Sequence, residues 1–410
     1  MQTRPILSTL RHHKLTAGLL MLQVAFTLAI VCNVMHMIVG RIERISVPTG
    51  IAENELATIP STAIDKAANH RAQLAADLAT LRAVPGVRAA AAVSYSLPLN
   101  RNEDTQGICP SKEALDRAIQ RNSIDGSGCM EPSIYDGTLG LVDTLGLHLV
   151  EGRDFQQGDY VADGKPVVAI VTRGLAQHLY PGKPALGQSM YDGDRFIRVV
   201  GIVDSLLRPE LRTPGVDNDS MILPQAPDGA SARYVLRSAP QDRQRVLAAA
   251  TAALWKVNPN RIINPARVQT YSQIRAAYFQ RDTTMIGLLI ASALGLLFVT
   301  ALGIAGLANF WVQQRTRSIG IRRAIGATHH DILRYFQDEN FLIVTAGVVP
   351  GVLLAIGLNL LLMTRYEVPR LPLWYLPIGA LVLWVLGQLS VLSPALRAAA
   401  VPPVVATRSV

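Results

Sequence analysis

Four long apolar stretches that contain no charged residue constrain this chain more than any other feature. They cover residues 15–40, 283–314, 340–364 and 371–396, and each is bounded on both sides by charged residues. About 20 apolar residues of helix cross the hydrocarbon core of a bilayer, so each stretch is long enough to span a membrane. We therefore predict a multi-pass α-helical membrane protein with four transmembrane helices, one followed after a long gap by three.

The gap between the first two stretches, residues 41–282, contains no such segment and mixes helix and strand signals. Runs of β-branched residues at 165–172 and 196–206 are bounded by Gly and Asp, as buried strands are. Ala and Leu recur at helical spacing over 61–82, which predicts an exposed amphipathic helix. We expect an inserted α+β extracytoplasmic domain over 41–282. Further strands are expected at 87–96 and 234–237, and helices at 111–121, 175–180 and 242–256.

Positive charge is distributed unevenly around the apolar stretches. Arg and Lys are concentrated in 1–14, 315–339 and 397–410, which precede the first stretch, separate the second from the third, and follow the fourth. Cytoplasmic segments of membrane proteins carry such an excess. Both termini and segment 315–339 are therefore expected in the cytoplasm, with domain 41–282 on the opposite side.

The formal net charge of +9 has the same origin. Basic surfaces bind nucleic acids by neutralising phosphates, but acidic and basic residues nearly cancel within 41–282. The excess lies beside the membrane segments, so we predict contact with membrane lipid and no nucleic-acid partner. The first stretch is too long for a signal peptide and is followed directly by Arg41, so we expect it to remain as an anchor.

Two of the three cysteines, Cys109 and Cys129, lie in the inserted domain. The helix expected at 111–121 and a Gly/Ser turn at 125–128 can bring their flanks together, and disulfides persist outside the cytoplasm. We expect a disulfide between Cys109 and Cys129, the alternative being two unrelated buried thiols. Cys32, in the first stretch, is expected to be a small apolar packing residue.

Small residues recur at intervals of four or eight in the second and third stretches. Such spacing lets helix backbones approach closely, so we expect a face that packs within the chain or against a second copy. The alternative is the general abundance of Gly and Ala in membrane helices. The positions are Gly287, Ala291, Gly295, Gly303, Gly347, Gly351 and Ala355.

Several classes of function find no support in the sequence. The four stretches contain no Asp, Glu, Lys or Arg, the groups that ion pathways use, which disfavours an ion-coupled transporter. The chain has no Gly-x-x-x-x-Gly-Lys-Ser/Thr phosphate loop, no Gly-x-Ser-x-Gly and no His-Glu-x-x-His, motifs that bind nucleotide phosphates or mark hydrolases and metalloproteases. We expect a non-catalytic subunit without a cofactor or metal of its own. A hydrolase triad using His70, His148 or His178 remains an alternative.

Segment 315–339 combines glycine breakers, clustered arginines and a helical patch expected to present apolar side chains. A solvated loop whose arginines only set the topology is one interpretation. Apolar and aromatic side chains bordered by arginines also favour docking to a cytoplasmic partner. The residues concerned are Arg317, Ser318, Gly320, Arg322, Arg323, Gly326, Ile332, Leu333, Tyr335, Phe336 and Glu339.

Several motifs follow one another in a distinctive order. Those of the inserted domain are Thr138-Leu-Gly-Leu-Val-Asp-Thr-Leu-Gly-Leu, Glu151-Gly-Arg-Asp-Phe, the run 167–171, Leu179-Tyr-Pro-Gly-Lys-Pro-Ala-Leu-Gly and Val199-Val-Gly-Ile-Val-Asp. This order resembles the periplasmic core domain of MacB-type ABC transporter permeases. Arg317-Ser-Ile-Gly-Ile-Arg-Arg-Ala-Ile-Gly-Ala-Thr resembles the coupling segment of the FtsX-like permease module. Together the matches cover most of the chain.

The resemblance implies that segment 315–339 sits in a groove of an ABC ATPase subunit and passes its motion to the second and third spans. ATP and Mg²⁺ would be bound by that separate partner. The resemblance also implies a bacterial inner membrane and a dimer with a second permease copy or paralogue. A periplasmic adaptor and an outer-membrane channel often complete such systems. The family pattern usually has Glu at the position of Ser318, so one polar contact expected with the ATPase is in doubt. Such a departure is expected of the less active half of a heterodimeric permease pair.

We therefore predict a permease subunit that couples ATP hydrolysis by a separate ATPase to periplasmic conformational change, that is, mechanotransmission. The implied substrates are peptides, lipoproteins or hydrophobic drugs. One alternative is an FtsX-like signalling subunit that activates a periplasmic cell-wall hydrolase or sensor without transport. Another is a tethered periplasmic enzyme. The size and motif order of 41–282 favour transport.

Overall fold

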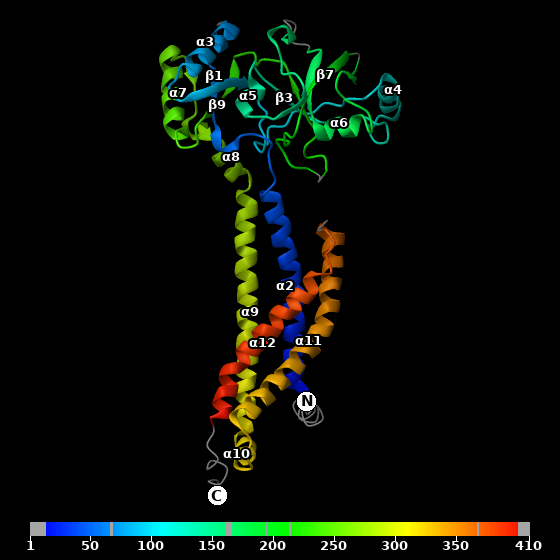
Figure 1. The fold of residues 1–410 in the computed structure, drawn as a ribbon, viewed down its shortest axis with the longest axis vertical. Coiled ribbons are helices and arrows are strands. Elements are labelled where there is room, and N and C mark those ends of the chain that lie inside the picture. Colours follow the sequence, from blue (N-terminus) through cyan, green and yellow to red (C-terminus); the bar gives the residue numbers. More distant parts are fainter. Residues whose placement is uncertain are drawn as a thin grey trace. The chain divides into compact units, whose positions relative to one another are not determined.

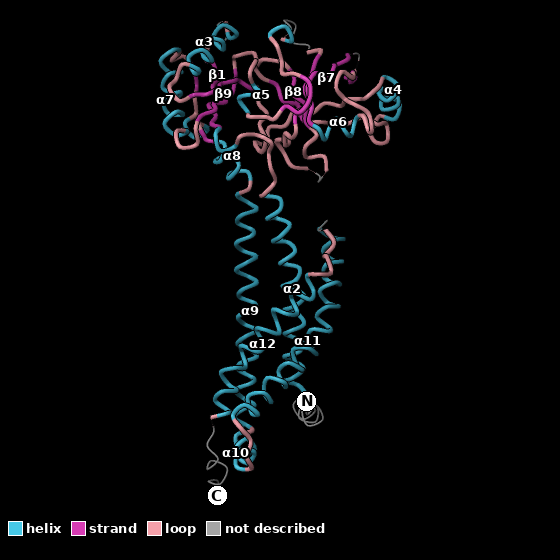
Figure 2. Tube along the Cα trace, viewed as in Figure 1, coloured by secondary structure: helices cyan, strands magenta, loops and turns pink. Residues whose placement is uncertain are grey.

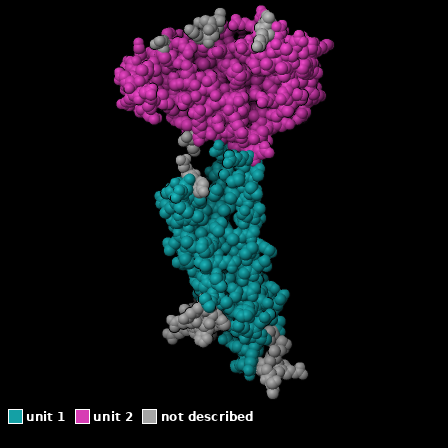
Figure 3. All heavy atoms as spheres, turned by 180° about the vertical axis from the view of Figure 1, so that it is seen from behind, with its two compact units in different colours: residues 1–46, 281–410 teal, residues 47–280 magenta. Residues whose placement is uncertain are grey.

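The computed structural model describes residues 14–65, 69–160, 166–193, 195–212, 215–366 and 369–400. The chain divides into an inserted domain, Val47–Gln280, and a membrane unit formed by the flanking segments Met1–Ser46 and Arg281–Val410 (Figure 3). This division lies just inside the predicted domain boundaries, 41–282, because the flanking helices continue beyond the apolar stretches. The predicted terminal segments 1–14 and 397–410 lie largely outside the described residues.

Four long helices form the membrane unit, and all four are long and apolar enough to cross a membrane. Their bounds are α2 (Lys14–Ile45), α9 (Gln280–Gln314), α11 (His329–Tyr366) and α12 (Tyr375–Ala399), with the short α10 (Thr316–Ala324) between α9 and α11 (Figure 1). The predicted one-plus-three arrangement is confirmed. The helices do not coincide with the predicted apolar stretches: α11 already begins at His329, within the predicted segment 315–339, and α12 begins at Tyr375, four residues after the start of the stretch 371–396.

Helix α2 packs against α11 and α12, and its buried residues belong to one apolar cluster with those helices. Cys32 is part of this cluster and carries a free thiol, which confirms its predicted packing role. Uncharged polar groups add bonds between helices. The hydroxyls of Thr27 and Thr300 share a hydrogen bond of 2.8 Å, and Asn33 Nδ2 donates to the Ala355 carbonyl at 3.0 Å. Such bonds hold membrane helices together where the hydrophobic effect cannot.

The small residues predicted to form a packing face fall into two groups, one buried and one exposed. A Cβ added to Gly347 would lie 2.8 Å from the Met21 carbonyl oxygen, and one on Gly351 would lie 3.0 Å from Ala25 Cα. A Cβ added to Gly303 would similarly lie against the Gln23 side chain, and Ala355 is fully buried. These four positions pack within the chain. Gly287, Ala291 and Gly295 are instead exposed on α9.

The inserted domain contains two β-sheets, which lie at opposite ends of the domain in Figure 2. The first sheet is antiparallel, in the order β10-β1-β9-β2, with β11 also paired to β1. Helices α3 and α7 cover one face, while α5 and α8 pack on the other. The bounds are β1 (Leu56–Ala63), β2 (Val87–Val93), β9 (Ser231–Ser238), β10 (Arg261–Ile262), β11 (Gln269–Thr270), α3 (His70–Arg82), α5 (Leu141–Leu145), α7 (Arg243–Val257) and α8 (Tyr271–Tyr278).

The second sheet is mixed, in the order β3-β8-β5-β7-β4, with β6 paired to β7. The strands predicted at 165–172 and 196–206 are β5 and β7, which run parallel to each other. The helix predicted at 175–180 is α6 (Arg173–Leu179), whose Leu175 and Leu179 bury against this sheet. The bounds are β3 (Ser133–Asp136), β4 (Leu149–Gly152), β5 (Val168–Thr172), β6 (Ser189–Asp192), β7 (Arg195–Val203) and β8 (Ser220–Leu223).

The helix predicted over 61–82 is wrong in its first part. Residues 61–63 complete β1, which pairs along its whole length with β9, and α3 begins only at His70, where Asn69 Oδ1 accepts a hydrogen bond from the Ala72 amide. The helix is also not exposed throughout, since Leu74, Leu78 and Leu81 are buried. Pairing with a strand distant in sequence overrides the local helical spacing.

A buried charge pair fixes α3 to the first sheet. Arg261 donates from Nη1 and Nη2 to the two oxygens of Asp77, at 2.8 and 2.7 Å, and the two side chains are only 1% and 2% exposed. The Tyr234 hydroxyl also donates to Asp77. Burial and this carboxylate raise the pKa of Tyr234, so the phenol stays neutral and remains a donor.

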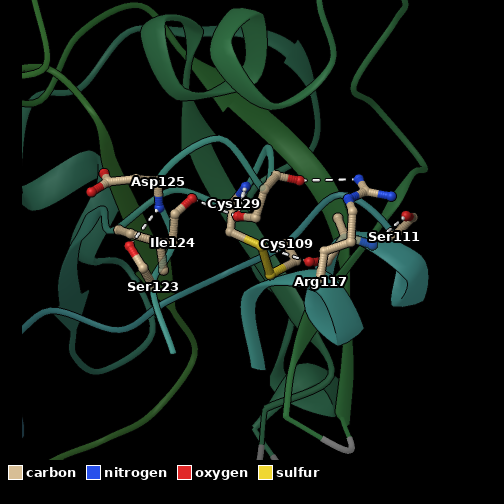
Figure 4. The surroundings of a disulfide bond; sticks show 9 residues. Cys109, Ser111, Arg117, Ser123, Ile124, Asp125 and Cys129 are labelled. Carbon is tan, nitrogen blue, oxygen red and sulfur yellow. Dashed lines mark hydrogen bonds between the residues drawn. A yellow bond between two sulfur atoms is a disulfide. The ribbon is translucent and has the colours of Figure 1, made fainter. Parts of the chain in front are cut away.

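The predicted disulfide between Cys109 and Cys129 is present. Helix α4 (Lys112–Arg121) lies between the two cysteines, and Ser111 Oγ caps it by accepting from the Ala114 amide at 3.2 Å (Figure 4). Arg117 Nη2 donates to the Ser127 carbonyl at 3.1 Å, which ties the helix to the returning turn. Helix and turn therefore bring the cysteines together as the sequence predicts.

Replacing both Cys109 and Cys129 with serine is expected to lower the stability of the inserted domain by about 3 kcal/mol, because the bridge closes a loop of moderate length. Urea unfolding of the full chain, with and without dithiothreitol, measures this. The reduced wild type should match the double variant, and the variant should be insensitive to dithiothreitol. A wild type that is equally stable in both conditions contradicts the prediction.

Candidate functional site

The segment between α9 and the membrane-spanning part of α11 folds as a tight hairpin of two helices. Helix α10 ends at Ala324, and Gly326 follows it with a φ of 107°, in the left-handed region that glycine adopts without strain. Thr328 and Asp331 then cap α11: the Thr328 amide donates to Asp331 Oδ2 at 3.0 Å, and the Asp331 amide donates to Thr328 Oγ1 at 3.2 Å. The Gly-Ala-Thr sequence thus fixes the turn.

This hairpin, residues 315–339, carries a groove of about 680 Å³. Side chains from both α10 and α11 line the groove, and they combine arginines with apolar and aromatic groups. We call it the hairpin groove. Its lining also contains two carboxylates, and consists of Arg315, Ser318, Ile319, Arg322, Ile325, Ala327, Asp331, Ile332, Arg334, Tyr335, Phe336 and Asp338.

The apolar side chains exposed by the hairpin differ from the predicted ones. Ile332 and Phe336 are buried and pack with Ile319 in the core of the membrane unit, so they do not present an apolar surface. Ile325 is instead 82% exposed and Ile321 46% exposed. Sequence reasoning missed both, although their spacing of four residues places them on one helix face.

The two adjacent arginines have different roles. The Arg322 guanidinium lies over the Tyr335 ring, 5.1 Å from the ring centroid. Arg322 is exposed and lines the groove. Arg323 donates to the Ala399 carbonyl at the end of α12 and to His329 Nε2, each at 3.0 Å. Arg322 is therefore available to a partner, whereas Arg323 connects the hairpin to α12. Arg317 and Ser318 are also exposed, and Gly320 is buried.

Glu339 does not reach the surface. Its side chain is 3% exposed and accepts from Arg315 Nη1 at 2.8 and 3.1 Å. Arg315 directly follows α9, and its guanidinium also lies 5.9 Å from the centroid of the Trp311 ring. The pair therefore links the end of α9 to α11 beneath the groove.

Helix α11 carries the groove residues and the third span on one helix. It runs from His329 to Tyr366 and contains Pro350, so Tyr335 and Ala355 are connected by about 30 Å of helix at 1.5 Å per residue. Among the described residues no group of three or more His, Cys, Asp and Glu could hold a metal ion.

Comparison with protein families identifies both parts of the chain. The model for the MacB-like periplasmic core domain matches residues 21–258, more than half of the chain, and the model for the FtsX-like permease C-terminal region matches residues 289–403. The chain therefore belongs to the MacB/FtsX-like family of ABC transporter permeases. It is a membrane protein with a periplasmic-type α+β domain.

Individual relatives agree with this assignment. The chain is 26% identical over 275 residues to the uncharacterized ABC transporter permease YknZ of Bacillus subtilis, covering 66% of this chain and 68% of that protein. It is 27% identical over 227 residues to the macrolide export ATP-binding/permease protein MacB of Acinetobacter baylyi, covering 54% of this chain and 33% of that protein. The chain thus spans only about a third of that MacB relative.

Two solved structures are also similar to the inserted domain. The extracellular domain of YknZ from Gram-positive bacteria is 14% identical and covers 50% of this chain and 99% of that chain, with a TM-score of 0.31. The periplasmic region of MacB from Actinobacillus actinomycetemcomitans is 13% identical and covers 57% of this chain and 97% of that chain, with a TM-score of 0.33.

Proposed function

We propose that this chain is the permease subunit of a MacB-like ABC transporter and that the hairpin groove docks onto a separate ATPase subunit. The continuity of α11 from the groove into the membrane span carries this proposal. The exposed Ile325 offers an apolar anchor, and Arg322 and Arg334 line the same groove and bring positive charge to it. A partner with an apolar pocket bordered by carboxylates would complement this surface.

Contacts within the membrane unit support a path for this motion. Displacement of the hairpin would move α11, and the buried Arg315–Glu339 pair would move the end of α9 with it. Helix α2 follows through its close packing on α11 at Gly347 and Gly351. At their other ends, α2 and α9 are joined by Arg41 and Asp282, whose charged atoms lie 2.5 Å apart. These two helices lead directly into the inserted domain along the chain.

ATP and Mg²⁺ are bound by the partner in this proposal. ATP-driven closure of an ATPase dimer would move the hairpins of two permease copies, or of this chain and a paralogue, and so move their periplasmic domains. The expected cargo is a peptide, lipoprotein or hydrophobic drug at the periplasmic side of a bacterial inner membrane. A periplasmic adaptor and an outer-membrane channel would complete the export route. The match of residues 21–258 to the MacB-like periplasmic core domain supports export over signalling.

Replacing Glu339 with glutamine tests the transmission step. The substitution removes the charge that pairs with Arg315 while leaving the exposed groove residues in place. We expect the ATPase to bind as before. The ATP-dependent motion of the inserted domain should fall to roughly half or less, because a broken buried ion pair no longer links α9 to α11.

A fluorophore on an Arg245→Cys variant, reconstituted with quencher-labelled lipids and the ATPase, reports this motion, since Arg245 is exposed in the inserted domain. Glu43→Gln makes the same chemical change at an exposed position of α2 outside the hairpin groove and should preserve the amplitude. An unchanged amplitude in Glu339→Gln would show that the pair transmits nothing.

A further inference from the structure

A second cavity, of about 300 Å³, lies in the inserted domain and is lined by three arginines and no carboxylate. It is formed by the loop after β2, by β9, by the segment from η3 (Pro265–Arg267) to β11, and by α8. The arginines are Arg101, Arg233 and Arg267. Neutral polar side chains, Asn102 and Gln269, lie beside them. We call this cavity the arginine pocket.

Arg233 is the half-buried arginine of the pocket, and no hydrogen-bond or ion-pair partner for its side chain is present in the described part of the chain. Its Nε atom is buried without a hydrogen-bond acceptor. Burial and the nearby Arg267 guanidinium lower the pKa of Arg233. Arg237, four residues further on the same strand face, is by contrast paired with Glu55 at 2.6 Å. An unpaired charge in such a place is costly unless a ligand supplies the missing anion.

The other two arginines stand at the exposed side of the pocket. Arg101 Nη2 donates to the Tyr278 carbonyl at 3.2 Å, and its guanidinium lies 5.4 Å from the centroid of the Tyr278 ring. The backbone of Arg101 is held at a φ of 63°, unusual for a residue other than glycine. Its amide is bonded to the Pro209 carbonyl at 3.1 Å. Arg267 is exposed at the end of η3. The fold therefore maintains three neighbouring positive charges without a negative one.

We propose that the arginine pocket binds a phosphate group. Guanidinium forks match the oxygens of phosphate in bidentate geometry, and three of them suit a tetrahedral group with more than one charge better than a single carboxylate. Tyr278, which lines the pocket, precedes the start of α9 by two residues along the chain. The headgroup of a phospholipid is therefore one source of the phosphate, and a soluble phosphorylated molecule is the other.

Titration of the full chain in detergent, in phosphate-free buffer at constant ionic strength, tests this proposal. The probes are inorganic phosphate and dihexanoyl phosphatidylglycerol, and thermal unfolding and calorimetry report binding. We expect saturable binding and a raised midpoint with the wild type. A response to the short-chain lipid alone assigns the site to phospholipid headgroups, and a response to inorganic phosphate assigns it to phosphate groups in general. Either result supports the proposal that the arginine pocket binds phosphate.

Two variants and a control make the test specific. Arg267→Gln, at an exposed position, should weaken binding about tenfold or more, since it removes a charge-assisted contact. Arg233→Met should abolish the response and raise the midpoint without ligand by about 3 °C, because it removes a buried unpaired charge. Arg245→Gln changes an exposed arginine paired with Asp242 outside the pocket and should bind like the wild type. Absence of binding to both probes, or equal weakening in all three variants, would overturn the proposal.

Discussion

The combined substitution Ile325→Asp and Arg322→Glu is expected to reduce affinity for the ATPase at least a hundredfold. Truncating or reversing a central contact of an interface costs 2 kcal/mol or more, and each factor of ten in affinity corresponds to about 1.4 kcal/mol. Ile325 is exposed and Arg322 contacts only the Tyr335 ring, so neither change disturbs the buried core. Binding of the purified ATPase to the permease in nanodiscs measures the effect.

The choice of Arg322 over its neighbour matters for this experiment. Arg323→Glu would also break the bond to the Ala399 carbonyl, and a loss of binding could then reflect a displaced hairpin. Ile321→Asp, at a half-exposed position on the same helix, should give an intermediate loss. If the double variant binds as tightly as the wild type, the hairpin groove is not the docking surface.

The second large effect concerns the inserted domain. Asp77→Ala is expected to destabilise it by about 3–5 kcal/mol, because Arg261 would remain buried without its counter-ion. The same change at Asp242, which pairs with Arg245 at the surface, should cost less than about 1 kcal/mol. Hydrogen exchange of peptides from α3 and β9 in the full chain measures both changes.

A compensating variant separates the loss of a contact from the burial of a lone charge. Asp77→Leu combined with Arg261→Met and Tyr234→Phe should recover most of the lost stability, since apolar groups replace the buried ion pair and the Tyr234 hydroxyl that donates to Asp77. Equal destabilisation by Asp77→Ala and Asp242→Ala would contradict the account of this pair.

The sequence predicts well the features that depend on local or one-dimensional information. The four spans follow from runs of apolar residues between charges, and the Cys109–Cys129 bridge follows from a helix and a turn between the two cysteines. Strands such as β5 and β7 are identified by their β-branched residues. The helix expected at 61–82 fails because β1 is defined by pairing with β9, far away in the chain.

Which side chains of the candidate site are exposed could not be predicted from local sequence patterns. Ile332 and Phe336 have the composition of a docking patch, yet they pack on Ile319 in the membrane unit, and Ile325 emerges instead. The arginine pocket combines Arg101, Arg233 and Arg267, which are widely separated in sequence and meet only through the fold of the domain. Local patterns identify the residue types, but tertiary packing decides which of them face a partner.

The central claim is that this permease works with a separate ATPase, and co-purification tests it most directly. The wild-type chain, solubilised in detergent, is purified from cells that also express an ABC ATPase of the same organism, and the ATPase is sought in the same chromatographic peak. We predict a stable complex with the wild type and none with Ile325→Asp/Arg322→Glu. Absence of the ATPase from the wild-type peak would contradict the proposed mechanism.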